Sequence, residues 1–145
     1  MVFNVKFKPV LSEFNNAKHS IEDALKSWDT PFMDMMDIML AIDESVTNII
    51  SHGYETSTLE DYIELKLASE KNKITIEISD NGKKFDFHSA PAPDIRKNLA
   101  GTKKGGFGVH LIKSVMDHVT HNRENNKNIL TLTKNLHLNN GHRNA

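Results

Sequence analysis

The spacing of apolar residues changes near Gly53, and this change limits the possible folds more than any other feature of the chain. Before it, apolar side chains recur at helical spacing through residues 11–28 and again through about residues 31–52. After it, residues 62–68 and 73–79 alternate apolar and polar side chains, as strands with one buried face do. The sequence therefore predicts an α+β fold.

Two further alternating stretches lie near the ends of the chain. Phe3, Val5 and Phe7 alternate with polar residues, and "NILTLTK" (128–134) does the same. The polar stretch "ASEKNK" joins the two central strands as a hairpin, and helical spacing returns from residue 108 to residue 119. We expect a two-layer α/β sandwich, a mostly antiparallel sheet with helices on one face.

The second helical stretch has recognisable ends. Thr30 predicts its N-cap, Pro31 its first helical position and Gly53 its C-terminal stop. Its early methionines are expected to fill the core with some exposure, in preference to forming a promiscuous binding surface; they are Met33, Met35, Met36 and Met39.

Length and composition bound the class of protein. The 145 residues predict one domain over the whole chain, with a polar tail at about 136–145. The absence of cysteine excludes disulfides and thiolate metal sites. A net charge of -1 gives no general support for binding nucleic acid or membrane, and no apolar run approaches the roughly 18 residues of a membrane span. The N-terminus lacks the apolar core of a signal peptide, so we expect a cytoplasmic protein.

The segment from residue 80 to residue 107 has no convincing period, although 93–100 has room for a short helix. Its first residues, Asp80-Asn81-Gly82, directly follow a predicted strand. One interpretation is a hairpin turn. The other is a carboxylate held at the strand end, facing a pocket and accepting a hydrogen bond from an exocyclic amine. Gly82 then lets a flat ring approach the backbone.

The end of the same segment, "KKGGFGVHLI" (103–112), places lysines and glycines before a helix. Backbone amides at such a helix N-terminus form an anion site. No GK[ST] sequence follows, and no strand precedes it as in a dinucleotide-binding unit. A flexible linker and a phosphate cradle both remain open for this stretch taken alone.

The second helical stretch also carries polar residues on one face: Glu44, Asn48 and either Ser51 or His52 recur at helical spacing. One interpretation is a solvated face. The other gives Asn48 a carbonyl oxygen for Mg²⁺, which prefers oxygen ligands alongside phosphates and water. It gives Glu44 a position from which to accept a proton from an attacking hydroxyl.

Taken in chain order, these three motifs resemble the N box and the two glycine boxes of the GHKL (Bergerat-fold) ATP-binding proteins. "ESVTNIISHGYE", "ISDNGKKFD" and "GGFGVHLIKSVMDHV" are similar to one branch of them, the RsbW/SpoIIAB-type anti-sigma factor serine kinases. The resemblance spans about residues 37–134. Each motif alone is weak evidence, whereas the set in this order is specific.

The resemblance implies ATP or ADP and Mg²⁺ as cofactors and assigns roles residue by residue. Glu44 becomes the general base, Asn48 the magnesium ligand, and Asp80 the acceptor from the adenine amine, with Gly82 beneath the ring. Backbone amides of Gly106 and Gly108 meet the phosphates, helped by Lys104. The remaining nucleotide-binding residues that it implies are Ser51, Phe85, Gly105, Phe107 and Val109. The loop at about 87–105 becomes the ATP lid.

The chain departs from this family in front of its last strand, where Lys127-Asn128 replaces the Gly-Thr that helps the adenine site. His52 is expected to cap the helix in preference to acting in catalysis. His118 and His121 lack a third residue at metal-ligand spacing, so exposed or loop positions are expected.

The resemblance implies a protein serine/threonine kinase that phosphorylates a STAS-domain anti-anti-sigma protein in a bacterial partner-switching pathway. A homodimer is expected, with a sigma factor as a further partner. The alternative is an ATP-binding module that sequesters its partner without phosphorylating it, and Glu44 argues against it. A histidine-kinase ATPase domain is a third option, disfavoured because no phosphoacceptor segment precedes the N box.

Overall fold

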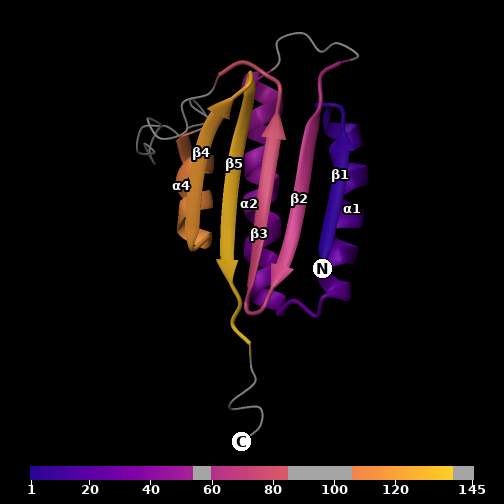
Figure 1. Cartoon of the computed structure of the whole chain (residues 1–145), viewed down its shortest axis with the longest axis vertical. Coiled ribbons are helices and arrows are strands. Elements are labelled where there is room, and N and C mark those ends of the chain that lie inside the picture. Colours follow the sequence, from indigo (N-terminus) through magenta and orange to yellow (C-terminus); the bar gives the residue numbers. More distant parts are fainter. Residues whose placement is uncertain (54–59, 85–105, 139–145) are drawn as a thin grey trace, which may run out of the picture.

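The computed structural model of the chain describes residues 1–53, 60–84 and 106–138. In chain order its elements are β1 (Val2–Phe7), α1 (Leu11–Ser27), α2 (Phe32–Gly53), β2 (Ile63–Glu70), β3 (Lys73–Asp80), α4 (Gly106–Val115), β4 (His118–Glu124) and β5 (Lys127–Asn135). The strands form a five-stranded sheet in the order β1-β2-β3-β5-β4, and every neighbouring pair is antiparallel. The helices cover one face of this sheet, which confirms the predicted two-layer α+β fold (Figure 1).

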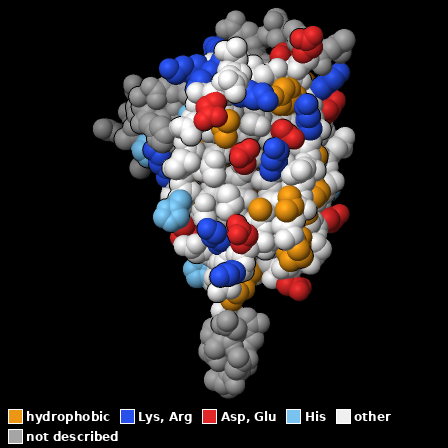
Figure 2. All heavy atoms as spheres, in the orientation of Figure 1, with side chains coloured by type: hydrophobic (Ala, Val, Ile, Leu, Met, Phe, Trp, Pro, Cys, Tyr) orange, Lys and Arg blue, Asp and Glu red, His pale blue; other side chains and the backbone are white. Residues whose placement is uncertain are grey.

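The two faces of the sheet differ because each strand alternates. On the inner face Ile76 lies opposite Leu132 and Ile78 opposite Leu130, and all four side chains are buried. On the outer face Lys66 lies opposite Glu77, and positively and negatively charged side chains are scattered over this surface together with some hydrophobic ones (Figure 2). One packed and one solvated face is the usual state of an antiparallel sheet.

The helices complete the core with apolar residues at helical spacing. The side chains that α1 and α2 bury completely are Phe14, Ile21, Leu25, Ile38, Ala41, Ile42 and Val46. Met35 joins this core, while Met33 and Met36 are exposed, as the expectation of core filling with some exposure requires. No helix in the described ranges is both long and apolar enough to cross a membrane.

The prediction for residues 108–119 is wrong at its end. Helix α4 stops at Val115, and the chain then forms β4, an edge strand paired only with β5 among the described strands. The inner positions of β4 are Val119, His121 and Arg123, of which only the first is apolar, so the strand shows no hydrophobic alternation.

Two smaller predictions also change. The hydroxyl of Thr30 is buried without a hydrogen-bond partner among the described residues, so it does not cap α2. The helix begins with the usual i to i−4 bond, from the Met35 amide to the Pro31 carbonyl over 2.9 Å. The start of the predicted polar tail is bound to α2, because the His137 amide donates to Asp34 Oδ2 over 2.6 Å. The predicted ATP lid, the helix at 93–100 and residues 139–145 lie outside the described residues.

Candidate active site

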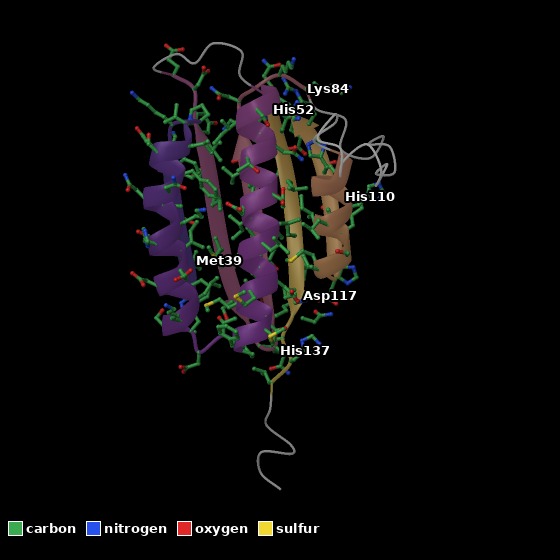
Figure 3. All side chains as sticks on the ribbon, turned by 180° about the vertical axis from the view of Figure 1, so that it is seen from behind. Met39, His52, Lys84, His110, Asp117 and His137 are labelled. Atoms are coloured by element: carbon green, nitrogen blue, oxygen red, sulfur yellow. The ribbon has the colours of Figure 1, made fainter. Side chains whose placement is uncertain are left out.

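A cavity opens at one end of the sheet, between the last turns of α2, the helix α4 and the adjoining ends of β3 and β5. The cavity has a volume of about 30 Å³. Its lining residues come from six segments of the chain and are Ser45, Asn48, Ile49, His52, Gly53, Ile78, Asp80, Lys83, Ile112, His121, Asn128 and Leu130. Figure 3 shows His52 on the last turn of α2, at this end of the molecule.

Asp80 is the central charged group of the cavity. It is the last residue of β3 and is 2% exposed. Its Oδ1 accepts hydrogen bonds from the Gly82 amide (2.8 Å) and from Asn128 Nδ2 (3.1 Å). Burial raises the pKa of Asp80, and these two hydrogen bonds and the charge of Arg123 partly oppose that rise.

Asp80-Asn81-Gly82 is not a hairpin turn. Both neighbours of β3 are already occupied, by β2 and β5, so the chain after Gly82 does not return as a pairing strand. The second interpretation from the sequence, a carboxylate held at a strand end beside a pocket, describes the geometry that the structure has.

Three hydrogen bonds fix the turn after Asp80 in place. The Lys83 amide donates to the Gly53 carbonyl over 3.1 Å, Arg123 Nη1 to the Gly82 carbonyl over 2.8 Å, and Asn128 Nδ2 to the Lys83 carbonyl over 2.9 Å. The donors lie on the turn itself, on β4 and on β5, so the carboxylate sits on a rigid support.

Glu44 and Asn48 lie together against the first turn of α4. A Cβ atom built on Gly108 would lie 3.3 Å from Glu44 Oε2 and 3.4 Å from Asn48 Nδ2. Only a residue without a side chain allows α4 to approach α2 this closely without displacing those groups. The structure thus brings three of the predicted site residues, from two helices, into contact.

Glu44 has no hydrogen-bond or ion-pair partner for its carboxylate among the described residues. Burial, and after it the neighbouring charge of Asp43, raises the pKa of Glu44 above its usual 4.5. A carboxylate that is partly desolvated and not neutralised is a stronger proton acceptor than an ordinary surface glutamate.

Helix α4 begins at the cavity end of the sheet (Figure 1). Its first turn lies beside the Glu44–Asn48 pair. The backbone amides and the aligned dipoles at a helix N-terminus favour an anion at that end. Val109, the next residue after Gly108, is 1% exposed and packs in the core.

The remaining predicted site residues fall into two groups. Ser51 is exposed, donates to the Thr47 carbonyl over 2.7 Å and is not among the residues lining the cavity. Phe85, Lys104 and Gly105 lie outside the described residues, and Gly106 and Phe107 are described only as backbone in α4.

Sequence reasoning missed Gly53 and His121 as site residues. Gly53 was assigned only as a helix stop, but a Cβ there would lie 3.9 Å from Asp80 Oδ1. His121 reaches the cavity because β4 pairs with β5 in a register that places it opposite Leu130. His118 lies on the other face of that strand, and no group of three metal-binding side chains occurs in the described part of the chain.

Comparison with known proteins agrees with this geometry. The family model described as histidine kinase-like ATPase domain matches residues 8–134. Two serine-protein kinases named RsbW, from Staphylococcus aureus strains MSSA476 and MW2, are 33% identical to this chain over 105 residues. The matched region is 70% of this chain and 65% of each relative.

Solved structures show the same fold. A crystal structure of the RsbU and RsbW domains of a Mycobacterium tuberculosis protein matches 94% of this chain and 32% of that chain, with a TM-score of 0.63 and 18% identity. The histidine kinase domain of a blue-light activated histidine kinase from Erythrobacter litoralis matches 73% of this chain and 46% of that chain, with a TM-score of 0.53 and 15% identity.

Proposed function

Because the chain belongs to the histidine kinase-like ATPase domain family, we propose that it is a serine-protein kinase of the RsbW type. In this proposal it transfers the γ-phosphoryl group of ATP to a serine of a STAS-domain anti-anti-sigma protein. The observation that carries the proposal is the Glu44 carboxylate, which has no partner among the described residues and lies close to Asn48 and to the first turn of α4.

The residues present fit ATP with Mg²⁺. At the base end, the buried Asp80 carboxylate and the unpartnered Asn128 Oδ1 are acceptors suited to an amine. At the phosphate end, the missing side chain of Gly108 lets the first turn of α4 lie close to Asn48. We assign the phosphates to the amides of that turn and to Lys104, and the metal ion to Asn48. Bound Mg²⁺ neutralises phosphate charge during transfer.

In the proposed reaction Glu44 accepts the proton of the attacking serine hydroxyl. The raised pKa of Glu44 brings its basicity closer to what a base needs near neutral pH. Asn48 and the first turn of α4 hold the reacting groups in line, and positioning together with charge neutralisation supplies most of the catalysis in phosphoryl transfer.

The same proposal includes binding without chemistry. We propose that the protein acts in the cytoplasm as a homodimer that also sequesters a sigma factor, and that phosphorylation of the STAS protein decides which partner is bound. The chain spans about 65% of the length of the relatives it matches, and these partners are part of the proposal.

Glu44→Gln tests the kinase directly, with transfer from labelled ATP to candidate STAS proteins as the measurement. We expect transfer to fall by about 10²- to 10⁴-fold, the usual contribution of a general base, with ATP affinity within a few-fold of wild type. Glu77→Gln, on the outer face of the sheet, is the matched control and keeps full activity.

Two results would contradict the proposal. One is a Glu44→Gln variant as active as wild type. The other is a wild-type protein that binds ATP and its STAS partner and transfers nothing, which would favour the sequestering module.

A further inference from the structure

Asn128 lies on β5 directly opposite Asp80 on β3, and its side chain is 5% exposed. Its Nδ2 donates to Asp80 Oδ1 over 3.1 Å and to the Lys83 carbonyl over 2.9 Å. A carboxamide nitrogen carries two hydrogens, so these two acceptors use both of them. They also fix which end of the amide is nitrogen, because an oxygen placed there would face two other oxygens.

The oxygen of the same amide is not used by these hydrogen bonds. Asn128 Oδ1 is buried and has no hydrogen-bond partner among the described residues, although Asn128 lines the cavity. A buried acceptor without a donor costs free energy, so native structures rarely retain one without a reason. A donor brought by a ligand supplies that reason.

Asp80 presents a second acceptor in the same place. Both of its internal hydrogen bonds end on Oδ1, and its Oδ2 accepts none from the part of the chain that the structure describes. The two free atoms, Asp80 Oδ2 and Asn128 Oδ1, are therefore both acceptors, and neither residue has a donor left. Such a pair favours a group with two N–H bonds and disfavours a carbonyl oxygen.

We propose that Asn128 is a base-selecting residue: its Oδ1 accepts one hydrogen of the adenine amine while Asp80 Oδ2 accepts the other. This inference rests on the proposed function, since it names how the same site selects its nucleotide. A threonine at this position, which the family resemblance implies as the usual residue, has a hydroxyl that donates as well as accepts. Both N–H groups of Asn128 are already engaged, so its side chain can only accept. Asn128 therefore rejects a 6-oxopurine more strongly than a threonine at this position would.

The first test needs no variant and measures nucleotide affinity of the wild-type protein by calorimetry. We expect N6-methyl-ATP, which has lost one N–H, to bind about tenfold more weakly than ATP, as one lost hydrogen bond predicts. Inosine triphosphate, with a carbonyl in place of the amine, should bind at least about a hundredfold more weakly. N6-methyl-ATP binding within twofold of ATP would overturn the inference, because only one N–H would then be read.

The second test replaces Asn128 by threonine, whose hydroxyl can donate a hydrogen bond. Asn128→Thr should narrow the ratio of ATP to inosine triphosphate affinity by about tenfold, because the hydroxyl donates to the carbonyl oxygen. Asn122→Thr, the same change at an exposed position on β4, leaves the ratio unchanged. An unchanged ratio in a folded Asn128→Thr protein overturns the inference. Failure of the wild-type protein to bind any of these nucleotides contradicts the proposed function instead.

Discussion

Within the described structure, the acidic residues of helix α2 fall into two groups, three that are paired and one that is not. Near its start, Asp34 contacts His137 (Oδ1 to Nδ1, 2.6 Å) and Asp37 contacts Lys134 (Oδ2 to Nζ, 2.8 Å). Farther along, Asp43 pairs with Lys18 over 3.1 Å. Glu44 is the one acidic residue of α2 whose carboxylate has no such partner in the described structure.

This difference separates structural charges from a reactive one. Each paired carboxylate of α2 connects the helix to another element, namely the end of β5, the segment after it, or α1. Glu44 faces the first turn of α4, and its pKa is raised because it is partly desolvated and lies beside Asp43. Glu44 itself does not line the cavity, but its neighbour Asn48 does. A carboxylate with a perturbed pKa and no partner in the described structure, next to such a residue, is typical of a catalytic site.

Lys134, the partner of Asp37, also binds helix α4. It is an inner-face residue of β5 with a buried side chain, and its Nζ donates to both Asp37 and the Val115 carbonyl, the latter over 2.6 Å. A lysine at the C-terminus of α4 also complements the negative end of the helix dipole. One side chain thus fixes α4 and α2 relative to each other, and both helices carry site residues.

The largest effect on stability is expected when Lys134 no longer connects β5 to α2 and α4. Lys134→Met should destabilise the fold by about 2–3 kcal/mol, because it leaves Asp37 and the Val115 carbonyl without their cation. Urea denaturation measures the loss. Lys66→Met, on the solvated face of the sheet, is the control and should change stability by less than about 0.5 kcal/mol. Equal effects of the two variants would show that the buried lysine does not hold the helices.

The next largest effect is a loss of activity, expected from a substitution at Gly108, beside Glu44. Gly108→Ala places a methyl group against Glu44 and Asn48 and should reduce phosphoryl transfer about tenfold, or about 1.4 kcal/mol in transition-state free energy. Stability should stay constant or rise by up to about 1 kcal/mol, since alanine is the better helix former. Activity and denaturation are measured on the same samples, with Ser114→Ala on the exposed side of α4 as control. Full activity in Gly108→Ala would remove the contact with Glu44 from the mechanism.

A smaller effect is expected on the stability of Glu44→Gln. The pKa of Glu44 is raised in the fold, so its contribution to stability is present below the unfolded pKa and is lost as pH rises through the folded pKa. Glutamine does not ionise, so the variant avoids that loss. At pH 7 it should be as stable as wild type or more stable by less than about 1 kcal/mol, because solvent screens this partly exposed group. A variant clearly less stable at pH 7 than at pH 4, relative to wild type, would reverse this sign.

The smallest effect sharpens the comparison within α2. Asp43→Asn removes the charge that helps raise the pKa of Glu44, so the acid limb of the pH–rate profile of phosphoryl transfer should move to lower pH. Loss of the Lys18–Asp43 pair should cost less than about 1 kcal/mol of stability, since both side chains are partly exposed. Asp23→Asn on α1 is the control, and a pH profile that does not move would separate Asp43 from the acid–base behaviour of Glu44.

Local patterns were sufficient for most of the fold. The periods of α1, α2, β2 and β3 follow from which side of each element faces the core, and such one-sided burial is visible in the sequence. The edge strand β4 was missed because its inner side carries His121 and Arg123, whose burial comes from the site and not from the apolar core.

The sequence by itself determined which chemical groups the protein has and their order: a carboxylate and an amide on one helix, an aspartate after a strand, and glycines before another helix. Only the tertiary structure decided that Gly108 contacts Glu44 and Asn48, and that Asn128 faces Asp80. Those contacts join residues 48 to 64 positions apart in the chain, and sheet register and helix packing set them. Spacing along a sequence records local periodicity, whereas a distance between elements depends on how the whole core packs.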